Sequence, residues 1–127
     1  ELEKGPVWQA FQLDSAASVL ALDSARVRWP EFKALGFIGA HRDGHECDYE
    51  VRMLAPSSGM SEDPITGSLN SALAHWLQAE GRLPQPVTVA QGTSINRHGR
   101  VSLRPLDDGS MMIGGQTHIL IDGRLTL

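Results

Sequence analysis

The 127-residue chain has little cysteine, no excess of basic residues and no long apolar run. Its single cysteine, Cys47, cannot form an internal disulfide, which fits a reducing compartment. A formal net charge of −4 argues against nucleic acid as a partner, because proteins that bind it present basic surfaces. No apolar stretch approaches the roughly 18 residues that span a bilayer, and no signal-peptide pattern is present. We therefore expect a soluble, cytoplasmic protein with neither nucleic acid nor membrane as a partner.

Several common enzyme signatures are also missing. The chain has no Gly-x-Ser-x-Gly elbow, no phosphate-binding P-loop and no dinucleotide fingerprint. These absences disfavour serine hydrolases, P-loop NTPases and Rossmann enzymes. The length suits one domain with its own core, and no linker or internal repeat interrupts it. We expect a single domain over residues 1–127.

The feature that is present is a polar segment at the start of an amphipathic helix. Asp63 and Pro64 suit the N-cap and first position of a helix, and Gly81 suits its C-terminal cap. Apolar residues recur between them at helical spacing, namely Leu69, Ala72, Leu73, Trp76 and Leu77. The sequence thus predicts a helix over residues 64–80. Its first backbone N–H groups, at residues 65–68, would attract an anion or a polar substrate.

Short strands dominate the rest of the chain. Alternating apolar residues predict a strand over residues 7–13, and Asp14 would cap a short helix over residues 15–22. Asp43-Gly44 predicts a two-residue hairpin turn. The remaining predicted elements are a helix over 30–35 and strands over 37–42, 45–53, 87–91, 94–97, 100–104, 111–113, 116–121 and 124–127. Because a sheet buries its apolar face, we predict an α+β fold in which a barrel-like, mostly antiparallel sheet curls around one central helix.

The segment Glu62-Asp63-Pro64-Ile65-Thr66-Gly67-Ser68 resembles the EDPxTGS signature of the phenazine-biosynthesis PhzF-like family, whose fold is similar to that of diaminopimelate epimerase. The resemblance extends over roughly residues 5–127. It departs at Leu69-Asn70, where many members have Ala-His, and at Leu54, where phenylalanine is frequent. The features that agree are Arg52-x-x-Ala55-Pro56, His75-Trp76, Gln91-Gly92, Arg97-x-Gly99-x-Val101 and Ile113-Gly114-Gly115.

This resemblance implies the carboxy-terminal half of an enzyme about twice as long, built from two similar halves that face each other across a cleft. Such an enzyme is a cofactor-independent isomerase that transfers a proton on a small polar acid. The resemblance implies catalytic roles for Asp63 and Ser68 and substrate binding by Thr66 and Gly67, with the general base in the other half. The implied partners are the acid substrate, the complementary N-terminal half and a second copy in a homodimer.

Other interpretations compete with this one. From local sequence alone, Asp63 is a plain helix cap and Ser68 an ordinary first-turn serine. A non-catalytic barrel-like binding or assembly module that retains the fold is the rival function. His41, His45, Glu46, Cys47 and Asp48 are metal-ligand types, but a two-residue hairpin would split them between sheet faces, so no metal is expected. Cys47 has no helix N-terminus beside it to make it a nucleophile, and His75, His98 and His118 have no spaced partners.

Overall fold

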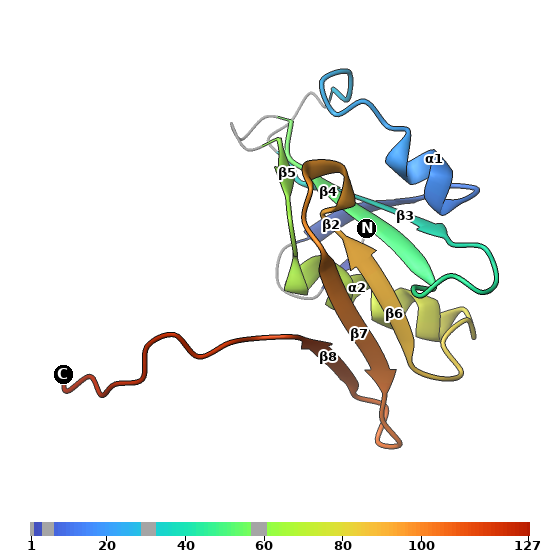
Figure 1. The fold of residues 1–127 in the computed structure, drawn as a ribbon. Helices are drawn as coiled ribbons and strands as arrows, with labels where there is room; N and C mark the ends of the chain where they lie inside the picture. The colour runs from blue at the N-terminus through green and yellow to red at the C-terminus, as the bar shows by residue number, and fades with distance from the viewer. Residues whose placement is uncertain (1, 4–6, 29–32, 57–60) are drawn as a thin grey trace.

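The computed structural model describes residues 2–3, 7–28, 33–56 and 61–127 (Figure 1). Two α-helices, one 3₁₀ helix and eight strands make up this part of the chain. In order they are β1 (Leu2–Glu3), β2 (Val7–Gln12), α1 (Ala16–Leu20), β3 (Leu35–Ala40), β4 (Tyr49–Leu54), β5 (Glu62–Asp63), α2 (Gly67–Ala79), β6 (Val87–Gln91), η1 (Thr93–Ile95), β7 (Gly99–Pro105) and β8 (Met111–Gly115). None of the described helices has the length and apolarity that crossing a bilayer requires.

The strands form one mixed sheet that curls around α2. Their order is β1-β2-β3-β4-β6-β7-β8, with β5 added to β4. Pairing is antiparallel except between β2 and β3 and between β4 and β6. Helix α2 contacts β1 and β2 at one end of the sheet and β7 and β8 at the other, so the sheet wraps around it as a half-barrel (Figure 1). The predicted α+β fold with a central helix is confirmed.

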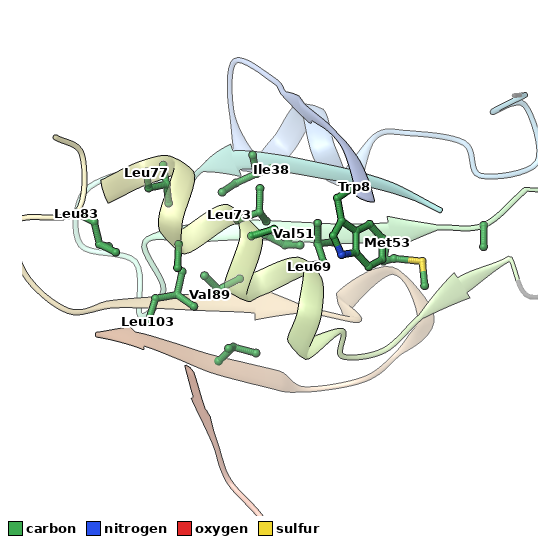
Figure 2. Packing of buried hydrophobic residues seen from close by; sticks show 14 residues of the cluster. Trp8, Ile38, Val51, Met53, Leu69, Leu73, Leu77, Leu83, Val89 and Leu103 are labelled. Atoms are coloured by element: carbon green, nitrogen blue, oxygen red, sulfur yellow. The ribbon is translucent and has the colours of Figure 1, made fainter. Parts of the chain in front are cut away.

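Helix α2 supplies the centre of the main core. Its residues Leu69, Leu73 and Leu77 are fully buried, as the helical spacing of the sequence predicts (Figure 2). Around them pack the inward-facing side chains of the strands, among them Trp8, Ile38, Val51, Met53, Val89 and Leu103. The helix ends in a Schellman motif in which Gly81, at φ 69°, donates its N–H to the Gln78 carbonyl at 2.9 Å. Gly81 is thus the C-terminal cap that the sequence predicts.

Helix α1 covers part of the opposite face of the sheet. It packs Val19 against Leu35, Phe37 and Leu54 in a second, smaller cluster. Its N-cap is Ser15, whose side chain accepts from the Ser18 N–H at 3.1 Å, and the prediction of Asp14 was wrong by one residue. The backbone of α1 lies so close to β3 that a Cβ at Gly39 would stand 2.3 Å from the Ser15 carbonyl oxygen. Gly39 therefore sets how closely α1 approaches the sheet.

The predicted two-residue hairpin is a longer connection. Strands β3 and β4 end their pairing at Ala40 and Tyr49, and residues 41–48 join them. Asp43-Gly44 does form a turn, since the His45 N–H donates to the Arg42 carbonyl at 3.1 Å and Gly44 has φ 83°. Beyond the last strand pair, the His41 N–H donates to the Asp48 carbonyl, while the Asp48 N–H donates to the Thr88 carbonyl on β6. Residues 30–32 of the helix predicted over 30–35 lie outside the described residues. Of the rest, residues 33 and 34 are not helical and Leu35 belongs to β3, so this prediction was wrong there.

The second half of the chain departs from prediction at two places. Residues 93–95 form a 3₁₀ turn between αL residues Gly92 and Asn96, where a strand was predicted over 94–97. Residues 116–127 contain no strand, and they extend away from the domain (Figure 1). Their apolar side chains are exposed, with Ile119 at 86% and Leu120 and Ile121 at 91%. Alternating apolar residues form a strand only beside a partner strand, and none lies beside this segment among the described residues.

Candidate functional site

The polar segment lies where β5 leads into α2, at one end of the half-barrel (Figure 1). Asp63 pairs with Met53 as the last residue of β5, so its backbone is extended. The helix begins only at Gly67, with Thr66 in the N-cap position. The predicted N-cap role of Asp63 and helical position of Pro64 are therefore wrong, because strand pairing to β4 holds the chain out of helix until residue 66.

A network of buried side chains fixes the Asp63 carboxylate. The Thr66 hydroxyl donates to Asp63 Oδ2 at 2.5 Å, and the Thr66 N–H donates to Gln91 Oε1 at 3.2 Å. Gln91 Nε2 donates to the Asp63 carbonyl at 3.1 Å and to Thr66 Oγ1 at 3.0 Å. Asn70 Nδ2 donates to Gln91 Oε1 at 2.8 Å. The Asp63 carboxylate is thus anchored, and the residue as a whole is only half-buried.

The N-terminus of α2 presents free hydrogen-bond donors beside this carboxylate. The Asn70 N–H makes the first helical bond, to the Thr66 carbonyl. Among the described residues, no protein group accepts from the backbone N–H of Gly67 or Ser68. A Cβ built on Gly67 would meet nothing within 4 Å, so the space over this backbone is open. The predicted site residues Asp63, Thr66, Gly67 and Ser68 thus lie together at one helix terminus, with a negative acceptor and positive-end donors side by side.

Two glycines allow Pro64 and Ile65 to lie close to the end of β6 and the start of β7. A Cβ at Gly92, which has φ 87°, would stand 2.8 Å from the Pro64 carbonyl oxygen. A Cβ at Gly99 would stand 2.4 Å from the Gln91 carbonyl oxygen and 2.8 Å from Ile65 Cγ1. Only glycine permits these approaches, so both positions are needed to seat the polar segment on the sheet.

Glu62, the first residue of the segment, has a structural role. Its carboxylate forms a buried, bidentate ion pair with Arg52, at 3.0 Å from Nε and 2.7 Å from Nη2. Arg52 Nη1 also donates to the carbonyls of Val19 and Leu22 at the end of α1. Both side chains are almost completely buried, on the face of the sheet opposite α2. Glu62 thus ties the polar segment to β4 and α1 rather than facing the Asp63 site.

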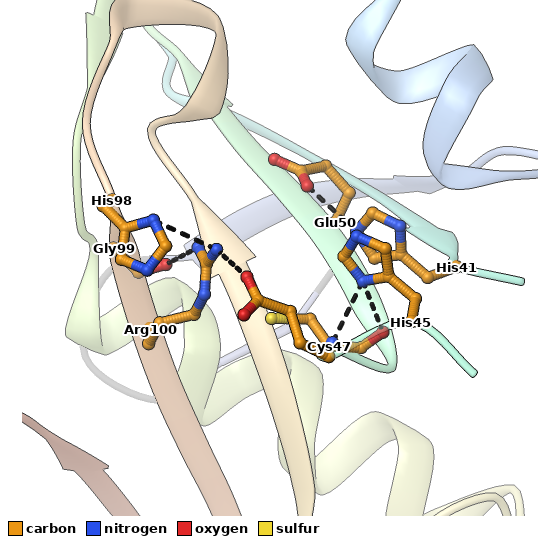
Figure 3. Close-up of polar contacts among 8 residues, drawn as sticks. His41, His45, Cys47, Glu50, His98, Gly99 and Arg100 are labelled. Carbon is orange, nitrogen blue, oxygen red and sulfur yellow. Dashed lines mark hydrogen bonds and ion pairs between the residues drawn. The ribbon is translucent and has the colours of Figure 1, made fainter. Parts of the chain in front are cut away.

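Cys47 and three of the histidines, His41, His45 and His98, lie around the β3–β4 connection and the start of β7 (Figure 3). The rings of His41 and His45 stack with centroids 3.7 Å apart, and His41 Nε2 is 3.0 Å from Glu50 Oε2. The two-residue hairpin that was predicted to split these residues between sheet faces does not form, because residues 41–48 make a longer connection. Among the described residues, no three His, Cys, Asp or Glu side chains are grouped as metal ligands.

Cys47 is buried, and this burial raises the pKa of its thiol. Its neutral form is therefore favoured, in agreement with the expectation that it is no nucleophile. Glu46 is exposed and pairs with Arg100, whose hydrogen bond and charge lower the pKa of the Glu46 carboxyl (Figure 3). Arg100 Nη2 also lies 3.2 Å from His98 Nδ1.

Two residues of the Asp63 site were missed as site residues in the sequence. Gln91 entered only as part of a motif, although its side chain joins Asp63, Thr66 and Asn70. Asn70 entered only as a departure from the family resemblance, and it is fully buried against the network. The sequence did contain a signal for Asn70, because it is a polar residue on the face of the helix that the apolar spacing predicts to be buried.

Comparison with known proteins identifies the family. The family described as phenazine biosynthesis-like protein (PhzC-PhzF) matches residues 4–123. Antisense-enhancing sequence 1 of Schizosaccharomyces pombe is 27% identical over 139 residues, which cover 97% of this chain and 45% of that protein. An uncharacterized isomerase of Pseudomonas aeruginosa is 33% identical over 112 residues, which cover 83% of this chain and 41% of that protein.

Solved structures agree on the fold. A phenazine biosynthesis PhzC/PhzF protein from Clostridium difficile superposes with a TM-score of 0.64 at 22% identity, over 94% of this chain and 45% of that chain. A PhzF family protein from Enterococcus faecalis gives a TM-score of 0.57 at 15% identity, over 87% of this chain and 44% of that chain. The present chain thus spans less than half the length of the curated relatives and solved structures that it matches. The family match over nearly all of its residues shows that the chain belongs to the phenazine biosynthesis-like (PhzC-PhzF) family.

Proposed function

We propose that residues 1–127 act as the carboxy-terminal half of a cofactor-independent isomerase. The reaction is proton transfer on a small polar acid held in the cleft between this half and a complementary one. Asp63 and Ser68 act on the substrate. Gly67 helps to bind it through its backbone N–H, and Thr66 helps through its hydroxyl, which holds the Asp63 carboxylate. The relative in Pseudomonas aeruginosa, itself described as an isomerase, supports this reaction class.

The observation that carries the proposal is that a hydrogen-bond acceptor, the Asp63 carboxylate, lies beside hydrogen-bond donors, the backbone N–H groups at the start of α2. The Asp63 carboxylate accepts from Thr66, and the residue is only half-buried, which suits an acceptor for a hydroxyl or amino group of a substrate. The N–H groups of Gly67 and Ser68 have no acceptor within the described part of the chain and lie at the positive end of the helix dipole, which suits a carboxylate. A small acid with a second polar group would satisfy both.

The general base belongs to the complementary half in this proposal. Glu62 is held in the buried ion pair with Arg52, so it is not available to abstract a proton. The nearby Asp63 already serves as an acceptor on this side of the cleft. The base removes a proton from one side of the substrate, and the orienting group holds the substrate from the other side. The two groups therefore belong to opposite sides of the cleft.

The exposed segment 116–127 supports association with that other half. Five large apolar side chains in it are at least 84% exposed: Ile119, Leu120, Ile121, Leu125 and Leu127. Burying apolar side chains of this size is favourable by about 1.5–3 kcal/mol each, so the segment favours a partner. We propose the complementary half as this partner, with a second copy of the chain as the competing occupant.

The test is exchange of a substrate proton with deuterated solvent, followed by NMR over a panel of small hydroxy, amino and unsaturated acids. The chain is assayed alone and together with the complementary half of a relative. We expect exchange only in the two-half assembly. Asp63→Asn and Ser68→Ala should lower the rate about 100-fold, as expected for losing a positioned catalytic group. The exposed Ser102→Ala is the matched control and should leave the rate unchanged.

Two outcomes would overturn the proposal in different ways. Exchange by residues 1–127 alone would show that the base lies in this chain. Absence of exchange in a folded two-half assembly, across the acid panel, would instead favour a non-catalytic binding or assembly module.

A further inference from the structure

Gln91 is a fully buried amide at the end of β6, and its bonding determines which way it points. The Thr66 backbone N–H is a donor only, so the Gln91 atom that faces it at 3.2 Å must be the oxygen. The Asp63 carbonyl is an acceptor only, so the atom that faces it at 3.1 Å must be the nitrogen. Both neighbours give the same orientation of the amide.

This orientation also determines the direction of the Thr66 hydroxyl. Gln91 Nε2 carries only donor hydrogens, so Thr66 Oγ1 must accept from it at 3.0 Å. The single proton of the hydroxyl is then directed to its other neighbour, Asp63 Oδ2, at 2.5 Å. The chain of donors runs in one sense, from Gln91 through Thr66 to Asp63, and it ends on the carboxylate.

We propose that Gln91 is a positioning residue that acts through Thr66 to hold the Asp63 carboxylate as an oriented acceptor for substrate. The inference rests on the proposed function of Asp63 and adds to it a residue 28 positions away that does not touch substrate. Because the Thr66 hydroxyl anchors one oxygen of the Asp63 carboxylate, the carboxylate rotates less freely and its second oxygen is held in place. Such anchoring maintains the geometry that proton-transfer chemistry needs.

The surroundings of Gln91 make this arrangement rigid. Asn70 Nδ2 donates to the second lone pair of Gln91 Oε1, so all four hydrogen-bonding positions of the amide are occupied. Gly99 brings β7 against the Gln91 carbonyl, and Gly92 brings the next residue against Pro64. The amide therefore cannot turn over without breaking several buried hydrogen bonds.

The test uses Gln91→Glu, Gln91→Met, Thr66→Val and Thr66→Ser in the two-half assembly. Gln91→Glu replaces the donor by an acceptor, so the Thr66 proton is drawn away from Asp63. Gln91→Glu and Thr66→Val should each lower the proton-exchange rate about 100-fold, the cost of a misplaced catalytic group. Thr66→Ser keeps the hydroxyl and should recover most of the activity that Thr66→Val loses. The exposed Gln85→Met is the matched control.

A second readout does not depend on activity. In protein labelled with ¹⁵N-glutamine, the side-chain amide of Gln91, assigned by its loss in Gln91→Met, should exchange with solvent far more slowly than that of Gln85. Thr66→Val should shift its resonances, and Thr66→Ser should shift them less. Thermal melting of every variant separates these effects from loss of folding.

The outcomes distinguish this inference from the proposed function. Equal exchange rates in Thr66→Val and Thr66→Ser, or a Gln91 amide as accessible as that of Gln85, would overturn the role of Gln91 even if the assembly is active. No exchange in the unsubstituted assembly would overturn the proposed function and the catalytic role together. The amide spectra would then still confirm or refute the hold of Gln91 on Thr66.

Discussion

Removing the charge of Glu62 should destabilise the protein rather than alter chemistry directly. Glu62 lies next to Asp63 in the segment that carries the family resemblance, so it is an obvious alternative for the catalytic base. In the structure its carboxylate bonds Arg52 at 3.0 and 2.7 Å, with both side chains at most 3% exposed. In Glu62→Ala the guanidinium would remain buried without its counter-charge.

The size of the effect follows from this burial. Removing one partner of a buried ion pair costs about 3–5 kcal/mol, because the remaining charge stays out of water. That is a large share of the 5–15 kcal/mol that stabilises a typical domain. Glu62→Gln keeps one acceptor oxygen and should fall at or below the lower end of the range. The double variant Arg52→Leu, Glu62→Leu removes both charges and should cost less than Glu62→Ala alone, although it gives up the bonds from Arg52 to the Val19 and Leu22 carbonyls.

Urea unfolding followed by tryptophan fluorescence and circular dichroism measures these differences. The exposed pair of Glu46 and Arg100 provides the comparison, and Glu46→Gln should leave the unfolding midpoint nearly unchanged. A Glu62→Gln protein with unchanged stability but no proton exchange would refute the structural role and make Glu62 a candidate base.

Three further predictions follow from packing and exposure. Gly39→Ala should destabilise the protein by about 1–3 kcal/mol, since its Cβ would meet the Ser15 carbonyl, whereas Gly123→Ala should have no effect on thermal melting. Iodoacetamide should label Cys47 more slowly in native than in urea-unfolded protein, because burial raises the pKa of its thiol. Because the folded protein favours the neutral thiol, the free energy of unfolding should be unaffected by this group below pH 9.0, the ordinary pKa of a cysteine thiol. It should fall as the pH rises past that value, which pH-dependent unfolding measures. Leu120→Asp should leave the melting of this chain unchanged but weaken its binding to the complementary half in titration calorimetry, and equal affinity would exclude segment 116–127 from that interface.

Local patterns in the sequence determined the elements that depend on local physics. The buried face of α2 follows from apolar residues at helical spacing, and its end at Gly81 follows from the freedom of glycine at positive φ. Strands β2, β6 and β7 follow from alternation bounded by turn residues. The sheet curled around one helix followed because this is the arrangement that buries the apolar faces of both.

Tertiary structure decided the start of α2 and the organisation of the site. Asp63 and Pro64 have the local chemistry of a helix start, yet pairing of β5 with β4 keeps them extended. The bonds that orient Asp63 come from Gln91, and the pairing that occupies Glu62 comes from Arg52 on β4. Such contacts depend on how β4, β6 and α2 meet in space, which no local pattern encodes.

Segment 116–127 is a second case in which a local sequence pattern did not determine the structure. Its residues alternate as in a strand, but a strand needs backbone partners as well as apolar side chains, and the described part of the chain offers none beside it. The sequence by itself determined the family, the central helix and the residues that carry the polar site. How those residues are connected to one another was decided by hydrogen bonds between elements far apart in the chain, because a side chain's role depends on the partners that folding brings to it.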